Sequence, residues 1–184
     1  MIDAPGRAEL VALLQQRSLR RGDFVLASGA RSSYYIDARL TSMSGAGQRL
    51  IGRLGLAQLD ECGWRPELVG GLTLGADPVA YALAHAAALA GRRLDAFTVR
   101  KEAKGHGAGR LIEGAEVNGR DVVVIEDTIT TGASALRAIE VVREAGGRVL
   151  GVLALVDRGE GGRDRLEAAG YRVAALVTAA ELLA

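Results

Sequence analysis

Two adjacent carboxylates, Glu126 and Asp127, stand between a continuous apolar run and a threonine-rich turn that contains glycine. The segment reads VVVIEDTITTGASA from Val122 to Ala135. A glycine-bearing turn that opens a helix presents backbone N–H groups to an anion, and the helix dipole adds partial positive charge. Hydroxyl side chains can add further donors, and those in the turn are Thr128, Thr130, Thr131 and Ser134. This pattern predicts a phosphate site, although the Gly-Lys-Ser/Thr of a P-loop is absent.

Carboxylates beside a phosphate site would repel the phosphate unless they face hydrogen-bond donors or positive charge. Ribose hydroxyls and Mg²⁺ are the two natural candidates. The pattern therefore favours a sugar 5′-phosphate, with the phosphate in the turn and the vicinal diol on the acids. The alternative is a simple capping loop, in which Asp127 or Thr128 caps the following helix. An acid pair, three threonines and a glycine together favour the sugar phosphate.

A second candidate anion site is the run RKEAKGHGAGR, residues 100–110. Four cationic side chains against Glu102 alone give it a local charge of about +3, and His106 can titrate near neutral pH. Three glycines deny the run a stable helix or strand, so we expect a mobile lid that closes over a polyanion. The alternative is a solvated basic loop. A third segment, GGLTLGAD at Gly70–Asp77, is a weaker signal and would offer N–H groups to a second phosphate group.

These segments can form one site only if the fold brings them to the same edge of a sheet. Apolar runs alternate with helical patterns, which predicts a mostly parallel sheet covered on both faces by helices. Ligands of such sheets bind beyond the carboxyl ends of the strands. The expected strands are Leu68–Gly70, Asp95–Val99, Asp121–Ile125, Val149–Val156 and Tyr171–Val177. The expected helices are Ala8–Gln16, Leu50–Leu59, Pro78–Ala90, Ser134–Ala145 and a short one within GGRDRLEAAG at residues 161–170, and a hairpin is expected over Gly22–Asp37.

Length and composition set the remaining bounds. A chain of 184 residues suits one domain. The formal net charge of +1 gives no global attraction to nucleic acid or to anionic membranes. Cys62 is the sole cysteine, so no intrachain disulfide is possible, and we expect a cytoplasmic protein. Pro78–Ala90, the most lipid-like run, is too short to span a bilayer.

In this order the segments resemble the type I phosphoribosyltransferases, which use 5-phosphoribosyl 1-diphosphate (PRPP). VVVIEDTITTGAS resembles the PRPP-binding signature of that family. RKEAKGHGAG resembles the mobile catalytic loop of its orotate-using branch, and SGARSSYYID and LVDRGEGG resemble the hood segment and a late strand-end loop of that branch. The resemblance covers Phe24 to about Arg165.

The resemblance implies an α/β fold of the type I phosphoribosyltransferase kind. Its central, mostly parallel sheet would be flanked by helices, with a small N-terminal hood formed mainly by about residues 1–45. It implies transfer of ribose 5-phosphate from PRPP to orotate in pyrimidine (UMP) biosynthesis. Mg²⁺ would be held mainly through PRPP rather than by protein ligands. The partners would be PRPP, orotate and a second copy of the chain, with the 100–110 loop acting in the partner subunit of a homodimer.

The same resemblance assigns roles to individual residues. The acid pair would bind the ribose hydroxyls, the turn the 5′-phosphate, and the basic loop the diphosphate. The implied PRPP-binding set is Arg100, Lys101, Lys104, His106, Glu126, Asp127, Thr128, Ile129, Thr130, Thr131, Gly132, Ala133 and Ser134. The implied catalytic residues are Lys104, His106 and Asp127. The implied orotate-binding residues are Tyr34, Tyr35, Thr130 and Arg158. Arg158 could otherwise pair with Asp157 or Glu160, and one of the two tyrosine rings could belong to the core.

Two positions depart from the family pattern. Ala27 stands where many members carry a lysine that contacts the diphosphate, and Thr73-Leu74 stands where many carry a Tyr-Lys pair. Three other functions remain open: a purine-base phosphoribosyltransferase, a PRPP-sensing regulator that binds nucleic acid, and an inactive relative kept as a subunit. A purine-base enzyme is not expected to carry the basic loop, and a regulator would need a nucleic-acid-reading element and a basic face.

Overall fold

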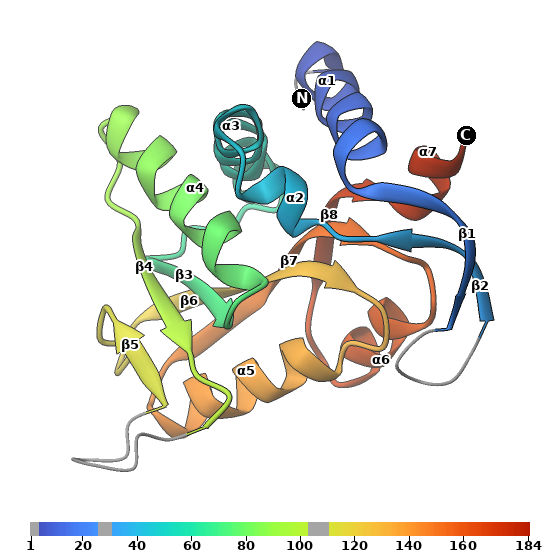
Figure 1. The fold of residues 1–184 in the computed structure, drawn as a ribbon. Helices are drawn as coiled ribbons and strands as arrows, with labels where there is room; N and C mark the ends of the chain where they lie inside the picture. Colours follow the sequence, from blue (N-terminus) through green and yellow to red (C-terminus); the bar gives the residue numbers. More distant parts are fainter. Residues whose placement is uncertain (1–3, 26–30, 103–110) are drawn as a thin grey trace.

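A six-stranded sheet in the order β5-β4-β3-β6-β7-β8 forms the centre of the molecule (Figure 1). The computed structural model describes residues 4–25, 31–102 and 111–184. Every neighbouring pair of strands in this sheet is parallel except β4 and β5. The strands are β3 Leu68–Leu72, β4 Asp95–Val99, β5 Ile112–Gly114, β6 Asp121–Ile129, β7 Arg148–Asp157 and β8 Val173–Thr178.

Helices cover both faces of the sheet, as the continuous apolar strands predict. On one face α1, α3 and α4 share a core with inward residues such as Val69, Val123 and Leu153. On the other face α5 and α6 pack on Val122, Val124 and their neighbours. The helices are α1 Ala4–Arg17, α2 Arg39–Ser42, α3 Gly45–Glu61, α4 Ala76–Leu89, α5 Ala133–Glu144, α6 Gly162–Ala168 and α7 Ala179–Leu183. The expected α/β fold with a mostly parallel sheet is confirmed.

A separate antiparallel pair, β1 Leu19–Val25 and β2 Arg31–Ile36, lies beside the carboxyl ends of β7 and β8 (Figure 1). It corresponds to the expected hairpin. The assignment of about residues 1–45 to a hood remains a prediction. Within the described part of the chain, no helix has the length and apolarity that crossing a membrane requires.

The end of strand β6, which carries the acid pair, differs from the expected boundary. The expected strand ended at Ile125, but β6 continues to Ile129, so Glu126 and Asp127 lie inside it. The strand continues because its backbone keeps pairing with β7, through Glu126 with Ala154 and Ile129 with Asp157. The connecting turn is therefore short, and α5 begins at Ala133.

Candidate active site

A cleft of about 360 Å³ lies at the carboxyl ends of β3, β6 and β7. Because these strands are adjacent and parallel, the segments that follow them meet at one edge of the sheet. The cleft is also bordered by the end of β2 and the start of α2. Its lining residues are Tyr35, Ile36, Asp37, Ala38, Arg39, Leu72, Thr73, Leu74, Gly75, Lys101, Glu126, Asp127, Thr128, Thr130, Ser134 and Arg158.

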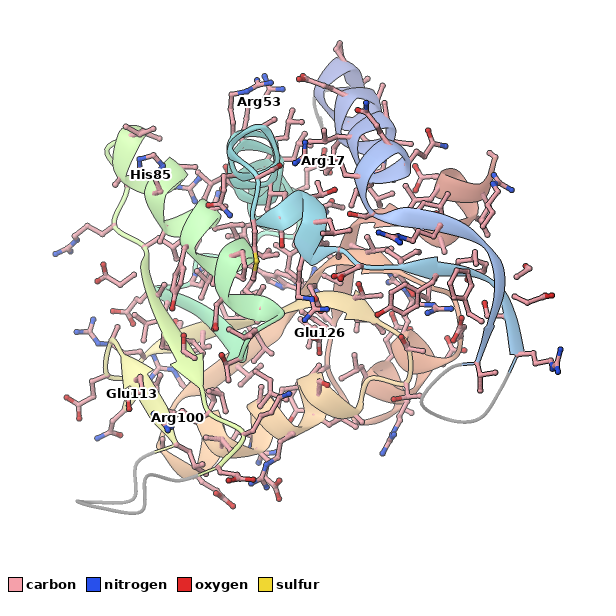
Figure 2. The ribbon with its side chains drawn as sticks, viewed as in Figure 1. Arg17, Arg53, His85, Arg100, Glu113 and Glu126 are labelled. Carbon is pink, nitrogen blue, oxygen red and sulfur yellow. The ribbon has the colours of Figure 1, made fainter. Side chains whose placement is uncertain are left out.

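The acid pair forms the floor of this cleft. Glu126 is 7% exposed and lies in the middle of the molecule (Figure 2), whereas Asp127 is half-buried. Burial, followed by the adjacent charge of Asp127, raises the pKa of Glu126 to about 8. Burial likewise raises the pKa of Asp127, against the opposing effects of the Thr128 N–H, which donates to its Oδ1 at 2.8 Å, and of Arg39. Two carboxyl groups so close together and so poorly hydrated favour a ligand that donates hydrogen bonds to them.

The turn after β6 has the shape that an anion site requires. Gly132 has φ 74°, and a Cβ there would lie 2.9 Å from the Gly162 carbonyl oxygen and 3.2 Å from Cγ of Leu166. A larger residue would therefore be both strained and crowded. Gly132 is the N-cap of α5 and provides no side-chain cap, so the first N–H groups of a twelve-residue helix face outward beside Thr130 and Ser134.

The remaining residues of this segment contribute in other ways. The side chain of Ile129 is buried in the core, and its carbonyl accepts a 3.0 Å bond from the Arg158 N–H. The Thr131 hydroxyl accepts a 3.5 Å bond from the Ala133 N–H. Thr128, Thr130 and Ser134 line the cleft.

Arg158 enters the cleft from the end of β7. It is 9% exposed, and its guanidinium lies 4.9 Å from the centroid of the Tyr34 ring. Its Nη2 lies 2.6 Å from Oε1 of Glu160, but among the described residues neither Nη2 nor Nε has an aligned hydrogen-bond acceptor. Asp157 pairs with Arg163 instead, at 2.7 Å. A buried guanidinium with donors to spare is well suited to a ligand carboxylate.

The two tyrosines of β2 have different surroundings. Tyr34 packs partly against the core and contacts Arg158, and its hydroxyl donates to Oε1 of Glu160 at 3.5 Å. Tyr35 is more exposed, lines the cleft and stacks against Phe24 at a centroid distance of 5.7 Å. Neither ring is fully enclosed in the core.

The basic run is only partly described. Lys101 lines the cleft, whereas Arg100 points to the sheet edge, where its Nη1 lies 3.4 Å from Oε1 of Glu113. Figure 2 shows Arg100 and Glu113 together, well apart from Glu126. Lys104 and His106 lie outside the described residues, as does Ala27.

Sequence reasoning missed one pair in the cleft. Arg39 donates from Nε and Nη2 to the two carboxylate oxygens of Asp37, at 2.8 and 3.0 Å. This bidentate bond lowers the pKa of Asp37, and together with the charge of Asp127 it raises the pKa of Arg39. The Asp-x-Arg spacing immediately after the tyrosine-bearing strand could have indicated this pair in the sequence.

The described residues contain no cluster of three or more His, Cys, Asp or Glu side chains suited to holding a metal ion. The acid pair is the best oxygen donor set in the cleft. Two carboxylates fit a cation that also takes ligands from substrate and water, which is the usual coordination of Mg²⁺.

Comparison with known proteins identifies relatives over nearly the whole chain. No family model matches it. The orotate phosphoribosyltransferase of Mycobacterium tuberculosis H37Rv is 48% identical over 178 residues, which are 97% of each chain. The orotate phosphoribosyltransferase of Streptomyces avermitilis is 48% identical over 165 residues, 88% of each chain. A crystal structure of the M. tuberculosis enzyme in complex with PRPP superposes with a TM-score of 0.84 at 44% identity, covering 98% of this chain and all of that one. On this similarity, and on a cleft of matching chemistry, the chain belongs to the orotate phosphoribosyltransferase family.

Proposed function

We propose that this chain transfers the ribose 5-phosphate group of PRPP to orotate, giving orotidine 5′-monophosphate and diphosphate for UMP synthesis. The observation that carries the proposal is the acid pair on β6, with Glu126 buried and Asp127 half-buried, which shares one cleft with Thr130 and Ser134 of the turn at the start of α5. Family membership agrees with this reaction.

The ribose 5-phosphate would lie along the end of β6. Glu126 and Asp127 would accept hydrogen bonds from the vicinal hydroxyls, which suits carboxyl groups that have few other donors. The N–H groups of the turn, from Ile129 to Ser134, and the hydroxyls of Thr130 and Ser134 would bind the 5′-phosphate. The negative charge of Asp127 would also stabilise the positive charge that develops at the anomeric carbon.

Orotate would bind between β2 and the end of β7. Arg158 would hold its carboxylate through Nε, which has no acceptor among the described residues, and through Nη2, which the ligand would share with Glu160. The ring would lie against Tyr34 or Tyr35, and Thr130 would contact it from the turn. Arg39, already fixed by Asp37, adds a further positive charge to this polyanion-binding cleft.

The reaction requires that the substrates are positioned and that the charge of the leaving group is stabilised. It does not require a nucleophilic side chain. The bond from the orotate ring nitrogen to the anomeric carbon forms as the bond from that carbon to the diphosphate oxygen breaks. The diphosphate leaves with the electron pair, and the proton of the ring nitrogen passes to the diphosphate or to water. Bound Mg²⁺ would offset part of the diphosphate charge. Lys101, Lys104 and His106 would neutralise or protonate the leaving group, whereas Arg100 would need to leave Glu113 at the sheet edge to take part.

A homodimer would allow the 100–110 loop to act across the subunit boundary. Apolar side chains are exposed next to the cleft, with Met43 at 56% and Leu74 at 59%, and Leu40 and Tyr81 lie on the neighbouring α2 and α4. Such residues at the rim of a site favour an interface with a second copy. A cytoplasmic location agrees with a chain that carries one cysteine.

The test is a base panel with Mg²⁺ and PRPP. We expect orotate to be consumed and diphosphate to be released, with no reaction of adenine, hypoxanthine or guanine, and little reaction without Mg²⁺. Turnover of a purine base in place of orotate would support the purine-base alternative. Salt-dependent nucleic-acid binding without turnover would support a regulator.

A further inference from the structure

A buried carboxylate lies beneath the turn between β3 and α4 and has no role in the reaction described above. Asp77, in the first turn of α4, is 9% exposed. Its Oδ2 accepts a 2.6 Å bond from the Thr73 hydroxyl, and its Oδ1 accepts a 2.9 Å bond from the Thr98 hydroxyl. The Thr98 hydroxyl is in turn 3.0 Å from the hydroxyl of Tyr81. Among the described residues no cation forms an ion pair with Asp77. Both of its carboxylate oxygens accept from threonine hydroxyls instead.

These bonds fix a turn that lines the cleft. Thr73 belongs to the segment Leu72–Gly75, which faces the cleft, whereas Thr98 lies on β4 and outside the cleft lining. The Thr73 N–H also donates to the Val99 carbonyl at 2.9 Å. The turn is thus held by its side chain through Asp77 and by its backbone through β4.

The order of the strands separates the two ends of the cleft. β3 and β4 lie on one side of β6, and β7 lies on the other. Arg158 follows β7, so the orotate end is on that side. Lys101 comes two residues after Val99, so the cationic segment and the Leu72–Gly75 turn share the opposite side. The Leu72–Gly75 turn and Lys101 therefore line the part of the cleft where a leaving diphosphate would lie, with Asp127 between the two ends.

We propose that Asp77 is a positioning residue, which holds the Leu72–Gly75 turn in the conformation that binds the diphosphate group of PRPP. The inference rests on the proposed function. Asp77 does not contact the ligand, because its carboxylate would repel a phosphate and both its oxygens are bonded to threonine hydroxyls. Its effect is to fix the direction of the N–H groups in the turn.

The experiment compares two ligands that share the ribose 5-phosphate and differ at the anomeric carbon. PRPP carries the diphosphate, and orotidine 5′-monophosphate does not. In the Asp77→Ala variant, we expect the Kd of Mg-PRPP to rise by about tenfold or more, as the loss of charged hydrogen bonds implies. The Kd of orotidine 5′-monophosphate should change less than about twofold, because its contacts lie beyond the turn.

A second variant covers the case in which Asp77→Ala fails to fold. Thr98→Val removes one of the two hydroxyl donors, nearly conserves shape and lies outside the cleft, so it should weaken Mg-PRPP selectively by a smaller factor. Tyr171→Phe is the control, since it removes a hydroxyl that bonds Arg143 on the far face of the sheet. Its affinities for both ligands should match those of the unmodified protein.

Two results would overturn the role of Asp77. One is an equal loss of affinity for both ligands, which would mean that the residue supports the fold alone. The other is unchanged Mg-PRPP binding in a folded variant. Failure of the proposed function would look different, because the unmodified protein would then bind neither ligand and would not consume orotate.

Discussion

The guanidinium of Arg158 lies 4.9 Å from the centroid of the Tyr34 ring and so connects the end of β7 to the separate β1–β2 pair. Arg158 lines the cleft, and Tyr34 is the neighbour in β2 of the cleft-lining Tyr35. A stacked arginine keeps its planar edge available for a carboxylate, whereas a lysine cannot reproduce both the stacking and the two-pronged bond.

Replacing Arg158 should therefore damage orotate binding selectively. We expect Arg158→Lys to raise the KM for orotate by about tenfold or more, through loss of the paired charged hydrogen bonds, with a smaller change in the KM for PRPP. Steady-state kinetics with each substrate varied in turn measures this. Arg172→Lys is a matched control, because Arg172 also lies over an aromatic ring, 5.3 Å from that of Trp64, but far from the cleft. A larger effect on PRPP than on orotate would contradict the assignment.

Gly75 and Asp127 come into direct contact across the cleft. A Cβ at Gly75 would lie 2.6 Å from Cγ of Asp127, a separation that real side chains do not adopt. Because the neighbouring atoms belong to a side-chain carboxyl group, the carboxyl can move and the fold can survive. We expect Gly75→Ala to lower kcat/KM by about tenfold or more while the thermal midpoint shifts by only a few degrees. Gly45→Ala is the control, since a Cβ there meets nothing within 4 Å. Full activity in Gly75→Ala would show that the position of Asp127 is unimportant.

Because Glu126 is buried, the free energy of unfolding should fall as pH rises. Burial raises the pKa of Glu126 from 4.5 to about 8, so over this range the folded chain holds a proton that the unfolded chain releases. Stability therefore falls as pH rises from about 5 to 8, and the full penalty remains above that range. Glu126→Gln removes the contribution of Glu126 to this dependence and leaves that of Asp127. We expect the variant to gain unfolding free energy relative to the unmodified protein as pH rises from 5 to 8, by at most about 1.4 kcal/mol per pH unit.

Urea unfolding at several pH values measures this difference. The gain should appear with PRPP absent, and the same variant should lose PRPP affinity because one acceptor for the ribose diol becomes a weaker one. A stability difference that is constant from pH 5 to pH 8 would mean that Glu126 is not protonated in the free protein.

The basic loop provides a kinetic prediction. Lys104 lies outside the described residues, and its proposed role is to neutralise the leaving diphosphate. We expect Lys104→Ala to lower kcat by about a hundredfold or more, the usual scale for losing one such electrostatic contact, with an unchanged thermal midpoint. The measurement is turnover at saturating substrates beside a thermal unfolding curve. An equal kcat in the variant would rule this role out.

The sequence predicted a helix, a strand or a site residue where neighbouring residues determine it. It did not predict those that depend on contacts between distant segments. The continuous apolar run before Glu126 predicted a buried strand, and Asp95–Val99 matched β4 in both bounds. The end of β6 could not be predicted, because its last residues are held in the strand by pairing with Val156 and Asp157 on β7. The short β5 was also missed, since its three residues are a strand only through pairing with β4.

The residues of the candidate site also differ in whether neighbouring residues alone reveal their roles. Glu126, Asp127 and the glycine turn are contiguous, so their chemistry was visible in the sequence. Arg39 was missed although its partner Asp37 lies only two residues away. The role of Asp77 could not be predicted, because Thr98 lies 21 residues further along the chain and meets it only when β4 aligns beside β3.

A crystal structure of the protein with Mg²⁺ and PRPP would test the proposed site most directly. We expect the ribose hydroxyls within hydrogen-bond distance of Glu126 and Asp127, and the 5′-phosphate on the N–H groups between Ile129 and Ser134. We also expect the diphosphate beside the Leu72–Gly75 turn. A sugar bound elsewhere, or a 5′-phosphate held away from the start of α5, would contradict the proposed site.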